Sequence, residues 1–235
     1  MTSRAVVVGR GRAGASFSAA LRDLGWEVEQ LAGRSEVIDG AGADLVLLCV
    51  PDAAVAPVAT RVVAPEAVVA HVAGSLGLDV LGDHPRVASL HPLTSLPDPA
   101  IGARRLRDGA TFAVAGDPLV RDVALALGGR PIEVADAHRA AYHAAACIGS
   151  NHLVALLDQV ERTAESAGLT LDDYLPLIRQ TLDNVAAVGP LAALTGPAAR
   201  GDRATLDRHR AVLDPADLPA YDALAERCAA LGARR

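Results

Sequence analysis

The stretch Val6-Val7-Val8-Gly9-Arg10-Gly11-Arg12-Ala13-Gly14 predicts the fold of the first half of this 235-residue chain. The three valines are typical of a buried strand, the glycines of a tight turn, and residues 15–24 of a helix. In a strand–turn–helix unit of this kind, the first glycine permits the turn and the second lets the backbone approach a pyrophosphate. The third glycine lets the helix pack on the strand, and the helix N-terminus binds phosphate through its free N–H groups. Residues 9–14 are therefore predicted to bind a dinucleotide.

The next strand indicates which dinucleotide. An NAD site usually carries an Asp or Glu about twenty residues after the glycine turn, where it binds the ribose hydroxyls. Here the expected strand 27–31 leads into Gly33-Arg34-Ser35. A guanidinium beside a hydroxyl suits a 2′-phosphate, so Arg34 and Ser35 predict NADP. The loop Val50-Pro51-Asp52 follows another buried strand and is predicted to contact the same cofactor, because ligands bind at the carboxyl edge of such sheets.

Composition excludes several classes of protein. The chain is 51% hydrophobic and 21% charged, which is ordinary for a globular protein, and no apolar run approaches the roughly 20 residues of a membrane span. The first strand begins within a few residues of the start, so we expect no signal peptide, no membrane partner and a cytoplasmic location. A net charge of −6 argues against nucleic acid as a partner.

Two residue types restrict the chemistry. All 22 basic residues are arginine, so no lysine can act as a general acid or phosphate ligand. Cys49, Cys147 and Cys228 are an odd number without metal-ligand spacing, which favours free thiols, and no metal site is expected.

The order of elements predicts two domains. Further strands are expected at residues 44–50, 67–72, 86–90, 111–115 and 130–134, with helices at 53–63 and 118–127. From residue 136 onward the pattern is helical, at residues 137–167, 171–188, 205–213 and 216–231. We therefore expect an α/β chain: a Rossmann-type doubly wound sheet over residues 1–135, followed by an all-helical domain over residues 136–235.

His91 is a candidate for substrate binding. It lies in Ser89-Leu90-His91-Pro92, at the expected carboxyl end of a strand. The alternative is a histidine that only bonds a backbone carbonyl and stabilises the loop.

The segment 139–152 contains the candidate catalytic residues. His143 and Ser150 are seven residues apart and share a face of an α-helix, and Asn151 is turned roughly 80° away. His143 is the acid/base candidate because imidazole titrates near pH 6.5, and Tyr142 lies beside it as a candidate substrate ligand. The alternative is a buried histidine bonded to a main-chain carbonyl while the alanines at 144–146 pack helix on helix.

The segment 194–202 offers a second polar group. Arg200 could bind a substrate carboxylate bidentately, beside Thr195 and Asp202. The alternative is an internal ion pair between Arg200 and Asp202 that stiffens the loop.

These segments resemble a bacterial Rossmann-like family whose second domain is of unknown function. That family belongs to the 6-phosphogluconate dehydrogenase-like superfamily, with ketopantoate reductases and pyrroline-5-carboxylate reductases. The matching segments are the glycine turn, Val50-Pro51-Asp52, Leu90-His91-Pro92, Tyr142-His143-Ala144 with Ser150-Asn151, and Leu194-Thr195-Gly196-Pro197 with Arg200-Gly201-Asp202.

The resemblance implies NADP-linked reduction of a small carbonyl or imine at an interdomain cleft, and a homodimer formed through the helical domains. Relatives commonly use a lysine on the long helix as proton donor, supported by an asparagine. Since this chain has no lysine, His143 would replace it, with Asn151 and Ser150 orienting the substrate. Ketopantoate, a 2-oxo acid of pantothenate biosynthesis, is the first expectation for the substrate. A cyclic-imine reductase and an NADP-binding sensor without turnover are the alternatives.

Overall fold

The computed structural model describes residues 2–235, and the chain divides into two compact units after Ser150. The first unit contains a seven-stranded sheet with the order β2-β1-β4-β6-β7-β8-β9. Its strands are β1 (Arg4–Val8), β2 (Glu27–Leu31), β4 (Leu45–Leu48), β6 (Val68–His71), β7 (Val87–Pro92), β8 (Thr111–Gly116) and β9 (Arg130–Glu133). Two short strands, β3 (Ile38–Asp39) and β5 (Val62–Val63), pair with each other in a separate sheet.

The pairing directions bring the ends of four strands together. Neighbouring strands from β2 through β7 are parallel, whereas β8 is antiparallel to β7 and β9 is parallel to β8. The register aligns Val8 with Leu48, Leu48 with His71, and His71 with Ser89. The carboxyl ends of β1, β4, β6 and β7 therefore meet at one edge of the sheet.

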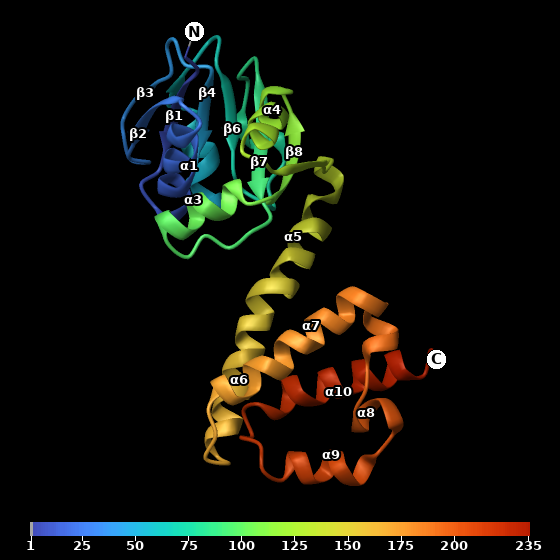
Figure 1. Cartoon of the computed structure of the whole chain (residues 1–235). Helices are drawn as coiled ribbons and strands as arrows, with labels where there is room; N and C mark the ends of the chain where they lie inside the picture. Colours follow the sequence, from blue (N-terminus) through green and yellow to red (C-terminus); the bar gives the residue numbers. More distant parts are fainter. Residues whose placement is uncertain (1) are drawn as a thin grey trace. The chain divides into compact units, whose positions relative to one another are not determined.

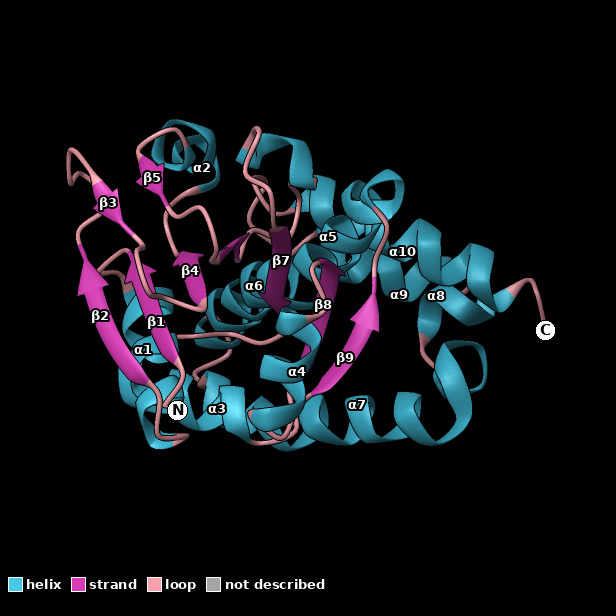
Figure 2. Ribbon diagram, turned by 90° about the horizontal axis from the view of Figure 1, so that it is seen from above, coloured by secondary structure: helices cyan, strands magenta, loops and turns pink. Residues whose placement is uncertain are grey.

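Helices cover both faces of this sheet. Figure 2 shows α1 (Arg12–Asp23), α3 (Pro99–Arg107) and α4 (Leu119–Ala126) on one side and α2 (Asp52–Ala59) on the other. The first side buries Phe17, Leu106 and Phe112, and the second buries Val55 together with Leu81 of the 3₁₀ helix η1 (Leu78–Leu81). Because β1 is covered on both faces, its residues 5–8 are a continuous run of buried apolar residues.

Three short helical elements follow β9 and lead to α6. They are the 3₁₀ turn η2 (Asp136–His138), the helix α5 (Arg139–Cys147) and the π-helical turn η3 (Ile148–His152). The second unit then contains α6 (Leu153–Glu165), α7 (Leu171–Ala193), α8 (Pro197–Arg200), α9 (Arg203–Arg210) and α10 (Leu218–Gly232), labelled in Figure 1. Thr170 and Asp173 form a capping box at the start of α7, and non-helical Gly189 (φ 77°) kinks α7 near its end.

The predicted fold class is confirmed: a Rossmann-type α/β sheet is followed by a helical part. The sequence prediction missed α3, α8, η1 and the two short strands. It also placed residues 136–150 in the helical domain, whereas in the structure they belong to the sheet unit. The reason is that Asp136 accepts a 3.0 Å hydrogen bond from the N–H of Leu78, and that side chains of α5 bond to β7. No helix among residues 2–235 is long and apolar enough to cross a membrane.

Candidate functional site

The glycine turn has the geometry of a phosphate-binding loop. Gly9 has a φ of 126°, and a Cβ there would lie 2.1 Å from the carbonyl oxygen of Cys49. A Cβ on Gly14 would lie 2.1 Å from the carbonyl oxygen of Gly9, so only glycine lets α1 pack this closely on the turn. A Cβ on Gly11, in contrast, would meet nothing within 4 Å. The turn is therefore tight beneath Gly9 and Gly14 and open at Gly11.

The same turn presents unpaired backbone donors. The first N–H groups of an α-helix have no acceptor within the helix. The N-cap of α1 is Gly11, which has no side chain that could cap them. Arg10 and Arg12 are exposed beside them, Ala13 is half-buried, and the Gln30 side chain donates a 2.9 Å hydrogen bond to the carbonyl of Gly9. An open face with free N–H groups and two cations suits an anionic group.

The loop after β2 is held by an arginine that sequence reasoning missed. The Arg61 guanidinium donates hydrogen bonds to the carbonyls of Gly33 and Ser35, each with a length of 2.8 Å. Arg34 is exposed in this loop, while the Ser35 hydroxyl donates to the carbonyl of Ala32. Arg34 is thus available to a phosphate, and Ser35 would have to rotate to donate to one.

The loops after β4 and β6 are tied together. Val50 and Pro51 lead into Asp52, which begins α2, and the hydroxyl of Ser75 donates a 2.6 Å hydrogen bond to the Asp52 carboxylate. Val50 also lies against the glycine of the preceding loop, because a Cβ on Gly33 would come within 2.9 Å of its methyl group. The residues predicted to contact the cofactor after β4 therefore lie beside the loop that carries Arg34.

His91, Tyr142 and His143 form a polar cluster at the carboxyl end of β7. The Tyr142 hydroxyl and Nδ1 of His91 are 2.7 Å apart, and the hydroxyl donates when His91 carries its proton on Nε2. The rings of His91 and His143 are nearly perpendicular, with centroids 6.0 Å apart. A Cβ on Gly74 would lie 2.8 Å from Nε2 of His91 and 2.6 Å from Nδ1 of His143, so a side chain at this position of the β6 loop would force the two rings to move.

The two nitrogens of His143 have different surroundings. Nδ1 is buried and has no hydrogen-bond partner among residues 2–235. Nε2 lies 3.5 Å from Sγ of Cys147, one helical turn later. Since a thiol is a weak hydrogen-bonding group, Nε2 is the nitrogen that can exchange this partner for another.

Burial keeps the side chains of His91 and Tyr142 uncharged. Desolvation, followed by the nearby charges of His143 and Arg139, lowers the pKa of His91 to about 4. Burial likewise raises the pKa of Tyr142 and lowers that of fully buried His71. His71 accepts from the N–H of Ala73 at Nδ1, which places its proton on Nε2 opposite the carbonyl of Gly77. At neutral pH, Tyr142 therefore keeps its proton and His91 remains a neutral acceptor.

The other predicted residues lie further along the chain. Ser150 donates to the carbonyl of Ala146 within the π-helical turn, and Asn151 begins the second unit. Because π turns have i→i+5 hydrogen bonds, the shared face assumed for His143 and Ser150 in a continuous α-helix does not apply across this turn. Arg200 ends α8, and Asp202 caps α9 by accepting from Thr205 instead of forming a salt bridge with Arg200.

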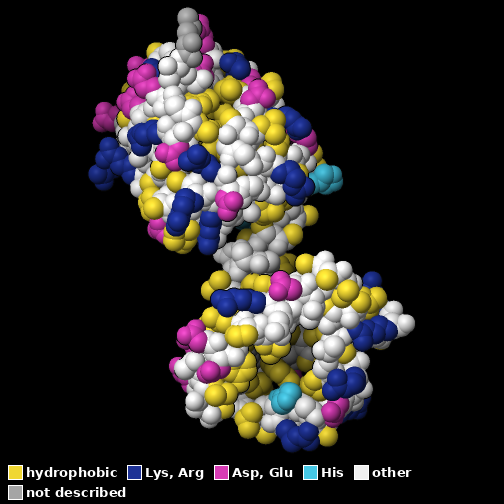
Figure 3. Space-filling model, in the orientation of Figure 1, with side chains coloured by type: hydrophobic (Ala, Val, Ile, Leu, Met, Phe, Trp, Pro, Cys, Tyr) yellow, Lys and Arg dark blue, Asp and Glu magenta, His cyan; other side chains and the backbone are white. Residues whose placement is uncertain are grey.

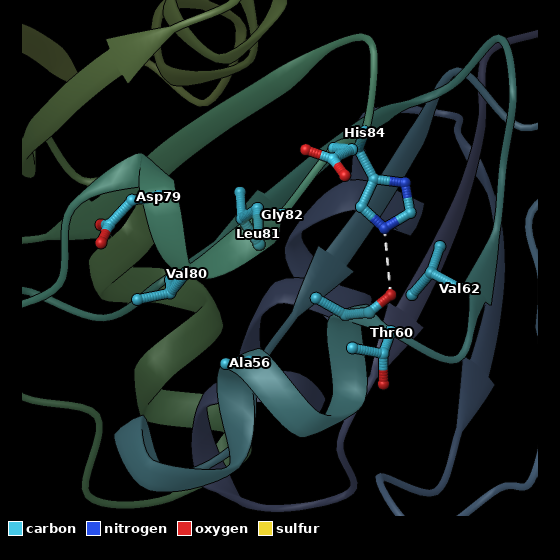
Figure 4. A pocket seen from close by; sticks show the side chains of 10 residues that line it. Ala56, Thr60, Val62, Asp79, Val80, Leu81, Gly82 and His84 are labelled. Atoms are coloured by element: carbon cyan, nitrogen blue, oxygen red, sulfur yellow. Dashed lines mark hydrogen bonds between the residues drawn. The ribbon is translucent and has the colours of Figure 1, made fainter.

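A separate hollow lies on the α2 side of the sheet (Figure 4). It has a volume of about 530 Å³ and is lined by the end of α2, Val62 and residues 79–84. At the rim of this hollow, Nε2 of His84 forms a hydrogen bond of 3.0 Å with the carbonyl of Ala59. None of the predicted site residues lines it, so it is distinct from the cluster at β7.

A family model places the chain among known sequences. The family described as a domain of unknown function, DUF2520, matches residues 111–228, half of the chain. The chain belongs to this family. The DUF2520 match begins at β8 and includes α5 with Tyr142 and His143. No curated protein matches the chain.

Solved structures share the fold of this DUF2520 chain over nearly its whole length. A proposed NADP oxidoreductase from Bacteroides fragilis is 22% identical with a TM-score of 0.81, over 97% of this chain and 98% of that one. A protein from Thermotoga maritima is 23% identical with a TM-score of 0.72, over 98% and 100%. Pyrroline carboxylate reductase from Plasmodium falciparum, solved with NADP bound, is 13% identical with a TM-score of 0.61, over 98% of both chains.

Proposed function

We propose that this DUF2520 protein is an NADP-dependent oxidoreductase that reduces a small 2-oxo acid, with ketopantoate as the first candidate. The observation that carries the proposal is the placement of two features at one sheet edge. The glycine turn follows β1, and the cluster of His91, Tyr142 and His143 lies at the end of β7, whose carboxyl end meets that of β1. In open α/β sheets, ligands bind outside the carboxyl ends of the strands.

The residues of the turn fit an NADP molecule. Gly11 leaves open space and the start of α1 offers free N–H groups, which suits the pyrophosphate. Arg34 would bind the 2′-phosphate by a charge-assisted hydrogen bond, while Arg61 holds its loop in place. Residues 50–52 line the same edge. The Bacteroides and Plasmodium relatives, whose names include NADP, support this assignment.

The chain itself would supply the proton and orient the substrate. When bound, NADPH supplies a hydride to the carbonyl carbon, so the carbonyl oxygen must gain a proton to become a hydroxyl. His143 would donate that proton from Nε2, since its present partner is only a thiol. Because the Tyr142 hydroxyl donates its one proton to Nδ1 of His91, its oxygen would accept a hydrogen bond from the hydroxyl group that forms when the substrate is reduced.

Ser150, Asn151 and Arg200 complete the proposal. Ser150 would orient the substrate. Asn151 and Arg200 belong to the second unit and keep the roles predicted from the sequence, an amide that orients a polar group and a guanidinium that matches a carboxylate bidentately. A 2-oxo acid presents both groups, a carbonyl to reduce and a carboxylate to bind.

A cyclic imine is the second candidate substrate. The chain contains no lysine to act as general acid, and reduction of an imine needs less help from a proton donor than reduction of a ketone. The pyrroline carboxylate reductase among the structural relatives favours the same class.

NADPH consumption measured against panels of 2-oxo acids and cyclic imines tests the proposal. Turnover of ketopantoate or a related 2-oxo acid supports the first candidate, and turnover restricted to the imines replaces it with the second. Saturable NADPH binding without turnover of any panel member would instead support an NADP sensor and contradict the oxidoreductase.

A further inference from the structure

Arg139 is a buried cation that the proposed chemistry leaves unused. It is the first residue of α5, and its side chain is only 1% exposed. One nitrogen, Nη2, donates to the hydroxyl of Ser89, and Nε lies 3.5 Å from the Asp136 carboxylate. Among residues 2–235, Nε and Nη1 have no hydrogen-bond partner. An apolar side chain could fill this space without the desolvation penalty of a charge, so packing alone does not account for an arginine here.

The contact with Ser89 is one of two matched contacts between α5 and β7. Arg139 and Tyr142 are three residues apart and lie on one face of the helix, whereas Ser89 and His91 are two residues apart and lie on one face of the strand. The Arg139 guanidinium donates a hydrogen bond to the Ser89 hydroxyl, and the Tyr142 hydroxyl is hydrogen-bonded to Nδ1 of His91. Two such contacts determine both the position and the rotation of α5 on the strand.

This rotation also places His143. It follows Tyr142 directly, and its Nδ1 would lie 2.6 Å from a Cβ on Gly74, in the loop after β6. A turn of α5 about its axis would move Tyr142 away from His91 and His143 away from Gly74 together. The contact between Arg139 and Ser89 lies one helical turn before both residues and opposes that movement.

The charge of Arg139 acts on the same cluster. The groups that face His91 are Tyr142, His143 and Arg139 from α5, His71 from β6, and Asp52 from α2. After burial and the charge of His143, the charge of Arg139 lowers the pKa of His91, while Asp52 raises it. Arg139 therefore helps His91 remain a neutral acceptor for the Tyr142 hydroxyl.

We propose that Arg139 is a positioning residue, whose buried guanidinium fixes α5 on β7 through Ser89 so that Tyr142 meets His91 and His143 meets the β6 loop. The effect of Arg139 on turnover rests on the proposed function, whereas its effect on the ionisation of His91 is independent of that function.

Three variants and two measurements test the proposal. Arg139→Gln removes the positive charge. Arg139→Lys keeps the charge but replaces the planar guanidinium with an ammonium group. Ser89→Ala removes the hydroxyl that accepts the hydrogen bond from Arg139. Arg121→Gln is the matched control, because Arg121 is an exposed arginine on α4 that pairs with Glu133. The measurements are kcat and KM for NADPH turnover as a function of pH, and the titration of His91 followed by NMR of the imidazole.

We expect Arg139→Gln to lower kcat about tenfold or more with little change in the KM for NADPH, because α5 loses its alignment but the glycine turn does not. The acid limb of its pH profile and the His91 titration should both move up toward the ordinary value of 6.5. Arg139→Lys and Ser89→Ala should both lower kcat, because each weakens the contact that fixes α5, and both keep a cation beside His91 and should therefore move its titration less than Arg139→Gln does. Arg121→Gln should match the wild type.

A folded Arg139→Gln variant with wild-type kcat and wild-type His91 titration would overturn the proposal. If Arg139→Gln does not fold, wild-type kcat in both Arg139→Lys and Ser89→Ala overturns it equally. If the wild-type protein turns over no substrate, the proposed function fails, and the His91 titration alone decides the role of Arg139: an unchanged value in Arg139→Gln contradicts it, and a raised value supports it.

Discussion

At the scale of single residues, Arg34 is the side chain that we propose selects NADP over NAD. It is exposed in a loop whose carbonyls are held by Arg61, so its guanidinium can turn toward a 2′-phosphate without any change in the backbone. NADH lacks that phosphate and would gain nothing from this side chain.

Arg34→Ala should therefore weaken NADPH binding roughly 10- to 100-fold, since a hydrogen bond to a charged group contributes about 1.5–3 kcal/mol. NADH binding should change little. Titration of the protein's fluorescence with each nucleotide measures both constants. Arg104→Ala, which alters an exposed arginine on α3, is the control and should leave both unchanged. Equal weakening for NADPH and NADH would remove Arg34 from the 2′-phosphate site.

His91 predicts how the fold responds to acid. Its pKa is about 4 in the folded chain and near 6.5 when unfolded, so between these values the unfolded chain binds a proton that the folded chain does not. The free energy of unfolding should fall as the pH drops from 6.5 to 4, by on the order of 3 kcal/mol from this residue. Urea denaturation across that range measures the slope. His91→Gln should flatten it, and an identical slope in the variant would assign the acid sensitivity to other groups.

At the scale of elements, the glycine turn separates structural from binding roles. Gly14 is in contact with the backbone of Gly9, whereas Gly11 faces open space. The two glycines therefore differ in what a methyl group would disturb.

Gly14→Ala should destabilise the sheet unit by about 1–3 kcal/mol, because backbone must move to admit the methyl group. Gly11→Ala should leave stability nearly unchanged and weaken NADPH binding, since the methyl group would occupy the open side of the turn. Thermal unfolding and nucleotide titration of both variants provide the comparison. Undiminished NADPH binding in Gly11→Ala would place the pyrophosphate elsewhere.

The elements with strong local signals were predictable from the sequence. The expected strand ranges match the seven strands of the main sheet. The signal was strongest for the central strands such as β4, because fully buried strands are continuous apolar runs. The helix expected at residues 171–188 ends where Gly189 leaves helical geometry. Helix α3 was missed although Asp98 caps it and Pro99 begins it, a pattern that signals a helix start.

The contacts that shape the site were not predictable in this way. Arg61 bonds carbonyls 26 and 28 residues away in the chain, and Arg139 bonds a serine 50 residues away. Such pairs carry no periodic signal. The π-helical turn at residues 148–152 also has no local marker, so Ser150 was placed by the 3.6-residue period of an α-helix.

At the scale of the whole molecule, the helical unit has little core of its own. Within the described part of the chain after Ser150, only Ala164 is buried, and the 23-residue helix α7 buries no residue. Leu177, Leu182 and Val188 of α7 are 60%, 53% and 59% exposed. Figure 3 shows hydrophobic side chains gathered around a hollow in this unit. A surface this apolar is typical of a protein interface.

We expect a second copy of the chain to cover α7 and form the homodimer. Leu182→Arg should convert the dimer to a monomer, because a charge would replace an apolar contact at the interface. Light scattering after gel filtration measures the mass. Leu125→Arg is the control, since Leu125 is similarly exposed (52%) but lies on α4 of the sheet unit, and it should stay dimeric. A monomeric wild type would exclude the dimer.

Hydride transfer itself tests the central claim most directly. In a single-turnover experiment, excess protein carrying NADPH is mixed with the best substrate of the 2-oxo acid and imine panels, and the loss of NADPH absorbance is followed. The account predicts a rapid decay in the wild type. In His143→Ala the decay should be at least about tenfold slower at unchanged NADPH affinity. No decay in the wild type would contradict the reductase, and wild-type decay in His143→Ala would contradict His143 as the proton donor.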